Sequence, residues 1–324
     1  MLFSFSVLAA AKRGEAGSAF SRSIRVNPCL SVVNVGKSAR AFTLVEMLTV
    51  IAIIGIVAAF AVPAIKNFGK NDVSVSASRQ LLDDIGYARQ LAMSQRATVY
   101  MVFVPTNFWI NPITTANLFT SGTLTVTQMV DATNILDRQL TGYTFMALGA
   151  VGDQPGRHQW HFLAPWQNLP QGAYIPLWKF YNPGGKTNAY AFSDPANNNV
   201  NFHISPFTYT NFPFPTDPSM DGNTNTEYLP YIAFNYLGQS SDYSGDLLSS
   251  ANSQEDSDYT GGGIDIPISQ GSVIDAIDVN TRMLQPNPPA IVENPPGNTT
   301  NISYNVIHID PLTGRATLEF HKLQ

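Results

Sequence analysis

The longest apolar stretch of the chain covers residues 47–65 and contains no charged residue. Its 19 residues are enough for a helix to cross the hydrocarbon core of a membrane, which takes about 20. One carboxylate, Glu46, stands at the edge of this stretch. An acid in that position is costly unless another group satisfies it, and such acids are candidates for function. The pattern predicts a transmembrane segment at about 47–65.

The pattern becomes amphipathic after this stretch. Apolar residues recur every three or four positions from Val73 to Ala92, while Arg79 and Asp83 fall off the stripe. This spacing predicts a helix that packs on a sheet. With the apolar half, it predicts one long helix from residue 42 to about 97. Pro63 lacks an amide hydrogen and crowds the preceding turn, which predicts a kink.

The remainder, residues 98–324, contains short β-rich runs between Pro, Asn and Gly. The clearest predicted strands are 98–104 and 231–236, the second followed by a turn at Gly238, and an alternating C-terminal hairpin over 304–321. Other strand candidates are 124–130, 143–148, 174–180 and 200–204, and we expect surface loops at 239–263 and 286–297. The predicted fold class is α+β, with a long N-terminal helix packed on an antiparallel sheet domain that carries loop insertions.

Charge is distributed unevenly along the chain. Residues 1–41 hold six basic residues and one acid, so the remainder has 12 basic against 22 acidic residues, a net charge of −10. A basic flank ahead of an apolar helix keeps that flank in the cytoplasm and sends the following domain across the membrane. Because phosphate backbones repel an acidic domain, we expect no nucleic acid partner. The only cysteine, Cys29, lies in the basic flank, so a disulfide within 42–324 is excluded.

The residues Phe42-Thr43-Leu44-Val45-Glu46, followed by Gly55 and Pro63, resemble the N-terminus of type IV pilins and type II secretion pseudopilins. In that family a prepilin peptidase removes a basic leader before the phenylalanine, and the new amine is methylated. The resemblance therefore implies a leader of residues 1–41, cleavage between Ala41 and Phe42, and N-methylation of Phe42. The family usually has glycine before the cut, and Ala41 at that position implies slower or less complete processing.

The resemblance implies a structural role. The subunit would be held by a single span in the bacterial inner membrane, with its C-terminal domain in the periplasm. An inner-membrane assembly platform would then add it, with other pilin-like subunits, to a secretion pseudopilus or type IV pilus-like fibre. Glu46 would be the assembly residue, paired with the amine of an adjacent subunit. A second, shorter resemblance, over 82–99 and 233–238, to minor pseudopilins of the H type implies a minor pseudopilin or minor pilin.

Other readings stay open for the N-terminus and for the role. A secretory signal peptide cleaved after Ala61, or an ordinary membrane anchor, would also begin with basic residues and an apolar stretch. The alternative function is a membrane-tethered binding module or adhesin that uses the same targeting signal. Glu46 separates the two roles, because a passive tether would be better without a carboxylate at the membrane edge.

The sequence contains no catalytic constellation, and we expect neither an enzyme nor a metal site. His158 and His161 have a spacing that binds zinc on a helix, but the prolines around them oppose a helix and favour a surface or aromatic-packed pair. The aromatic residues of 158–181 are those of a core more often than of a carbohydrate-binding face. The acids of the 242–258 loop are candidates for Ca²⁺, although their spacing matches no calcium loop and favours solvated side chains; they are Asp242, Asp246, Glu255, Asp256 and Asp258.

Overall fold

The computed structural model describes residues 42–111, 115–122, 124–153, 159–180, 190–193, 200–214, 226–246, 263–299 and 305–320, with the helical backbone alone over 59–72. The predicted leader, residues 1–41, lies outside the described residues, and so do His158, Glu255, Asp256 and Asp258. The chain divides into two compact units, Met1–Val57 and Ala58–Gln324.

The N-terminal helix α1 covers Leu44–Gln95, close to the predicted range of 42 to about 97. In the first unit the described side chains from Phe42 to Val57 are exposed. Pro63 is part of the helix, and the kink expected there stays a prediction. Among the helices of the described residues, none is long and apolar enough to cross a membrane.

The predicted apolar stripe of the second half of α1 is confirmed. Its side chains are fully buried from Ala77 to Ala92, whereas Arg79 and Asp83 on the other faces are exposed. The stripe packs against strands of two sheets, for example Val99 of one and Ile307 of the other. Burial of this stripe, rather than helix propensity alone, therefore stabilises this half of α1. The buried stripe consists of Ala77, Leu81, Ile85, Ala88 and Ala92.

The larger sheet of the second unit is antiparallel, and its central strand β1 covers Thr98–Phe103. The order is β10 (Ser240–Ser241), β9 (Thr226–Phe234), β1, β2 (Gly142–Leu148) and β3 (Trp160–Phe162); β8 (Thr208–Pro213) also pairs with β9, and β4 (Gln167–Asn168) with β2. Met101 faces the core under α1, while Tyr100 and Val102 belong to a second apolar cluster on the opposite face. Because β1 is covered on both faces, its sequence is almost continuously apolar.

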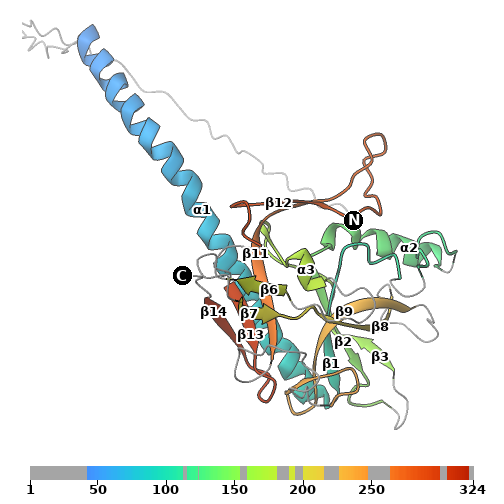
Figure 1. The fold of residues 1–324 in the computed structure, drawn as a ribbon. Helices are drawn as coiled ribbons and strands as arrows, with labels where there is room; N and C mark the ends of the chain where they lie inside the picture. The colour runs from blue at the N-terminus through green and yellow to red at the C-terminus, as the bar shows by residue number, and fades with distance from the viewer. Residues whose placement is uncertain are drawn as a thin grey trace, which may run out of the picture. The chain divides into compact units, whose positions relative to one another are not determined.

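A second antiparallel sheet contains the C-terminal hairpin (Figure 1). Its order is β12 (Ala290–Glu293), β11 (Ile264–Ile274), β13 (Asn305–Ile309) and β14 (Ala316–Phe320), and β5 (Ala173–Tyr174) also pairs with β11. A separate pair is formed by β6 (Tyr190–Ser193) and β7 (Val200–Ile204). The predicted hairpin is confirmed. It belongs to this second sheet, whereas the sequence pattern suggested one sheet under the helix.

Two predicted strands are wrong because local signals for helices override a β-rich composition. Residues 124–130 contribute to helix α2, Val126–Thr133, because Thr125 and Gln128 form a reciprocal capping box at its start. Residues 174–180 contain only the end of β5 and then the short helix α3, Leu177–Phe180. In α3 the amide of Lys179 donates to the carbonyl of Pro176, which lies directly before the helix.

The long strand β11 was not predicted, and β12 lies inside the predicted loop 286–297. Gly271 and Pro267 interrupt the apolar pattern of β11, which makes the segment look like a loop. Gly271 is needed there, because a Cβ at this position would come within 2.4 Å of the carbonyl oxygen of Val292 on β12. Close approach of two backbones explains a glycine within a strand.

Candidate functional site

A reciprocal cap joins Thr43 and Glu46 at the start of α1. The amide of Glu46 donates to the hydroxyl oxygen of Thr43 at 3.2 Å, and the amide and hydroxyl of Thr43 both approach Glu46 Oε2 at 3.4 Å. This is the capping-box arrangement of a Thr at the N-cap and a Glu three residues later. It satisfies amides that have no partner within the helix, and it places a negative charge at the positive end of the helix dipole.

The cap adds Thr43 to the residues singled out from the sequence. Phe42 and Glu46 were candidates for processing and assembly, whereas Thr43 had no role of its own beyond being part of the motif. The Thr-x-x-Glu spacing directly before an apolar run was the signal that identifies it. Both side chains are exposed in the first unit, so the carboxylate of Glu46 is accessible to a second partner.

Comparison with known proteins adds one finding for this segment. Residues 36–62 match the model of the prokaryotic N-terminal methylation motif. The methylation motif includes Ala41, Phe42, Glu46 and Gly55, and it ends one residue before Pro63. It supports a relationship to type IV pilin-like proteins, and with it processing by a prepilin peptidase and a membrane-anchored N-terminus. No curated protein and no solved structure matches the chain.

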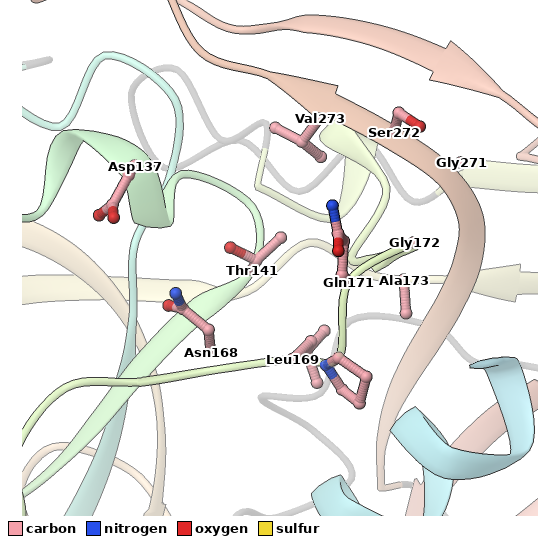
Figure 2. Close-up of a pocket in the computed structure, with 11 residues that line it drawn as sticks. Asp137, Thr141, Asn168, Leu169, Gln171, Gly172, Ala173, Gly271, Ser272 and Val273 are labelled. Atoms are coloured by element: carbon pink, nitrogen blue, oxygen red, sulfur yellow. The ribbon is translucent and has the colours of Figure 1, made fainter. Parts of the chain in front are cut away.

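The second unit contains a pocket of about 450 Å³ (Figure 2). It lies between the short 3₁₀ helix η1 (Leu136–Arg138), the segment 168–173 and the end of β11. Its walls combine aliphatic side chains with hydroxyl, amide and carboxylate groups, so it offers both apolar contacts and hydrogen-bonding groups. The side chains that supply these groups are Asp137, Thr141, Asn168, Leu169, Gln171, Ser272 and Val273.

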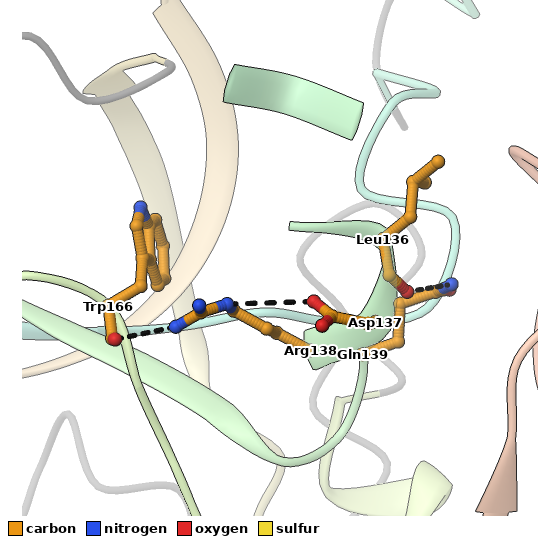
Figure 3. A network of polar contacts seen from close by, with 5 residues as sticks. All are labelled: Leu136, Asp137, Arg138, Gln139 and Trp166. Atoms are coloured by element: carbon orange, nitrogen blue, oxygen red, sulfur yellow. Dashed lines mark hydrogen bonds and ion pairs between the residues drawn. The ribbon is translucent and has the colours of Figure 1, made fainter. Parts of the chain in front are cut away.

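Polar side-chain contacts surround η1, the helix that carries Asp137 (Figure 3). The guanidinium of Arg138 donates from Nη1 to the carbonyl of Trp166 at 2.5 Å, and its Nε lies 3.6 Å from Asp137 Oδ1. The buried amide of Gln139 donates to the carbonyls of Leu136 at 3.1 Å and Asn287 at 3.3 Å. These contacts fix η1, while the Asp137 side chain stays about half exposed.

Two of the described histidines each pair with one carboxylate. His161 Nε2 lies 2.8 Å from Asp153 Oδ2, and His308 Nδ1 lies 2.7 Å from Asp265 Oδ1. The hydrogen bond that His308 donates to the Asp265 carboxylate raises the pKa of His308, against the lowering effect of burial. Within the described residues, no three His, Cys, Asp or Glu side chains are grouped to hold a metal ion.

The acidic loop is only partly described. Asp242 Oδ1 accepts hydrogen bonds from the amides of Ser244 at 2.8 Å and Asp246 at 3.0 Å, which closes a local turn. Calcium binding by the 242–258 loop stays a prediction, because three of its five acids lie outside the described residues.

The described aromatic residues of 159–180 serve the core. Trp160 has its ring centroid 5.3 Å from that of Tyr100 and 5.4 Å from that of Phe212, and Phe162 and Trp166 pack on the same cluster. This agrees with core packing, the preferred interpretation of their sequence pattern.

Proposed function

We propose that the chain is the precursor of a structural pilin-like subunit. Its helix, with a membrane span at about 47–65, holds the subunit in the bacterial inner membrane, and residues 98–324 form the periplasmic domain. An assembly platform then transfers the subunit into a fibre with other pilin-like subunits. The observation that carries this proposal is the match of residues 36–62 to the N-terminal methylation motif.

Processing is the first step of the proposed function. A prepilin peptidase cleaves between Ala41 and Phe42, which removes the basic leader of residues 1–41, and the new amine of Phe42 is methylated. The mature chain then begins with a cation one residue before the Thr43 cap. N-terminal sequencing of the protein extracted from membranes tests this step. A start at Phe42 supports it, and a start at Val62 establishes a secretory signal peptide instead.

Glu46 is the proposed assembly residue. A charged side chain in a membrane costs roughly 2.5–3.5 kcal/mol on insertion scales, so pairing of this carboxylate lowers the free energy of the embedded helix. Thr43 satisfies it within one chain by hydrogen bonds of 3.4 Å, which are long. The methylated amine of a neighbouring subunit offers a full opposite charge. The carboxylate therefore gains more from a neighbour in the fibre than from its own cap.

Two variants separate the charge of Glu46 from its role as a cap. Glu46→Gln keeps an oxygen that accepts the hydrogen bonds of Thr43 but removes the charge, while Glu46→Ala removes both. If the charge drives assembly, both variants insert into the membrane and neither enters the sedimentable fibre. If the cap is the requirement, Glu46→Gln assembles and Glu46→Ala does not. Assembly of both at the wild-type level contradicts the role of Glu46.

Among pilin-like subunits, the role that we propose for this chain is that of a minor pseudopilin or minor pilin. It rests on the short resemblance to H-type pseudopilins over 82–99 and 233–238. The alternative, a membrane-tethered binding module or adhesin, is favoured by the polar pocket beside Asp137. Quantifying the chain relative to other subunits in isolated fibres tests the assignment. A minor subunit is present in small proportion, and a tethered module is absent from the fibre.

A further inference from the structure

The strands of the second sheet run along α1. Asn305 at the start of β13 donates to Ser74 Oγ at 2.7 Å, and the carbonyl of Thr313 just after this strand accepts from Arg89 at 2.8 Å. Strand β13 therefore runs in the same direction as the helix. Its antiparallel neighbour β11 runs back, toward the N-terminal part of α1.

The end of β11 lies close to Val73 of α1. The amide of Gly271 donates to the carbonyl of Gly172 at 3.0 Å, and a Cβ on Gly172 would lie 3.3 Å from Val73. From Val73 the helix continues back to Ala58 within the second unit, and the proposed membrane span ends at about residue 65. Residues 66–73 separate the two points, about 12 Å of helix at 1.5 Å per residue. This end of the second unit is therefore the one that faces the bilayer when the span is inserted.

A structured arm, residues 274–285, continues β11 at this end and returns to β12 (Figure 1). A bridge between Ile277 and Leu284 closes it. Asp278 organises its turn, because Oδ1 accepts from the amides of Asn280 and Thr281 at 2.8 Å each. The turn is therefore held in one conformation by its own hydrogen bonds.

The tip of the arm presents apolar side chains to solvent. Val279 is 82% exposed and Met283 is 68% exposed, and Ile274 and Ile277 nearer the base are exposed as well. Turns are ordinarily built from Gly, Pro, Asn, Asp and Ser, so a valine at the tip of a built turn is unusual. A group of exposed apolar side chains of this kind indicates a contact surface.

The charges of the arm do not select an ionic partner. Arg282 is exposed in the turn, and Asp275 and Asp278 carry the opposite charge. The carboxylate of Asp278 is also occupied within the arm, where Oδ2 accepts from Gln285 at 3.0 Å. The apolar side chains therefore have to supply the contact.

We propose that the arm docks on the lipid bilayer that holds the span, with Val279 and Met283 between the headgroups and the acyl chains. The place of the arm selects this partner. The headgroup layer takes up about 6 Å of the 12 Å of helix between the span and Val73. Residues 272–279 lead from Gly271 to the tip and cover up to about 26 Å at 3.3 Å per residue, so the tip reaches the membrane.

A shallow contact is sufficient for this docking. Apolar groups at a membrane surface enter the boundary of headgroups and acyl chains by about 5–10 Å. Because the span already tethers the domain, the effective concentration of the arm at the bilayer is high, and a weak contact is populated. The docked arm would fix the orientation of the domain on the membrane before assembly. This inference rests on the membrane anchor of the proposed function.

Lipid quenching of a probe on the full-length chain tests the docking. In a Cys29→Ser background, Val279→Cys or Leu312→Cys is labelled with the same fluorophore, and the protein is reconstituted in phosphatidylcholine vesicles that contain a nitroxide lipid. Leu312 is the matched control, because it is 62% exposed on the turn beside Arg89, about 24 Å further along α1 than Val73. We expect quenching at Val279 to be at least about twofold greater than at Leu312. Equal quenching at the two positions overturns the docking.

Iodide and lipid composition distinguish other partners of the arm. Protection of the Val279 probe from aqueous iodide without quenching by the nitroxide lipid shows that a second copy or another part of the chain covers the arm, and it overturns the docking. Quenching should be the same when phosphatidylglycerol is added and when the salt concentration is raised. Quenching that requires phosphatidylglycerol assigns the contact to Arg282 and overturns apolar insertion.

A charge at the tip provides a second test. With the probe moved to Ile277→Cys, Val279→Asp is expected to lower lipid quenching roughly threefold or more, because a carboxylate is costly in lipid. Leu312→Asp should leave it unchanged, and equal effects of the two substitutions contradict the contact. Flotation of the chain with the vesicles reports the anchor separately. A chain that does not float overturns the proposed anchor and the docking together, whereas a chain that floats without quenching overturns the docking alone.

Discussion

Tyr143 on β2 donates a hydrogen bond of 2.5 Å to Asp84 on α1, across the junction of helix and sheet. Gln80, one turn earlier on α1, completes the contact by donating to the Tyr143 hydroxyl at 2.8 Å and to the carbonyl of Asn168 at 2.9 Å. Burial raises the pKa of Asp84, and the bond from Tyr143 opposes that increase. The contact therefore satisfies a half-buried carboxylate and fixes the rotation of α1 on the sheet.

Tyr143→Phe is expected to destabilise the second unit by about 1–3 kcal/mol, because it leaves the carboxylate of Asp84 and the amide of Gln80 without this partner. Thermal unfolding of the detergent-solubilised protein measures the change. Tyr87→Phe is the matched control, since Tyr87 is 44% exposed and its ring contacts Phe145 edge-on. An equal loss of stability in the two variants would contradict a specific role for the Tyr143 hydroxyl.

Replacement by alanine is expected to change the stability of the protein in opposite directions at two glycines. Gly86→Ala should stabilise α1 by about 1 kcal/mol, because a Cβ there meets nothing within 4 Å and alanine is the better helix former. Gly271→Ala should destabilise the second unit, because the new Cβ would lie 2.4 Å from a backbone oxygen of β12 and force β11 and β12 apart. Chemical denaturation of both variants checks this, and a neutral Gly271→Ala argues against the register of the two strands.

Arg89→Ala is expected to loosen the two neighbouring turns 235–238 and 310–315, which Arg89 joins. The guanidinium donates to carbonyls of both turns, and hydrogen bonds of charged groups each contribute about 1.5–3 kcal/mol. Amide hydrogen exchange in 235–240 and 310–315 should accelerate, while exchange in β2 stays unchanged. Arg79→Ala is the control, because Arg79 lies exposed on α1. The same acceleration in that variant would indicate a general effect of lost charge.

The elements that could be predicted from the sequence are those whose apolar residues recur at a regular spacing. The stripe from Ala77 to Ala92 specifies one buried face of α1, and the alternation on both sides of Asp310–Arg315 specifies the C-terminal hairpin. Phe42 and Glu46 could be proposed as processing and assembly residues because the motif that contains them is a local string of residues. In each case, neighbours in the sequence carry the complete signal.

The pocket and the junction of the turns 235–238 and 310–315 were not predicted, because they depend on contacts between distant segments. The pocket brings Asp137 to Ser272, and Arg89 joins turns that follow it by about 150 and 220 residues. Strand β11 was missed for a related reason. Its apolar residues are interrupted by Pro267 and Gly271, and the partners that make these residues suitable lie on β13 and β12.

The ionisation of Glu227 is expected to make the free energy of unfolding depend on pH. This residue of β9 is 6% exposed, and its Oε2 is buried without a hydrogen-bond partner in the described part of the chain. Burial raises its pKa from 4.5 to about 7, while a backbone hydrogen bond from Tyr228 lowers it. The folded protein therefore binds more protons than the unfolded chain between these two values. Stability from this residue is fully present below pH 4.5 and falls as the pH rises to about 7.

Glu227→Gln is expected to remove this dependence. The neutral amide resembles the protonated acid, so the variant should match the wild type near pH 4.5 and exceed it above pH 7, by up to about 3 kcal/mol from the pKa difference. Thermal unfolding between pH 4.5 and 8 measures the difference. Asp246→Asn, at an exposed position after β10, is the control and should leave the slope unchanged. A wild-type slope retained in Glu227→Gln would show that another group, such as His308, dominates this pH range.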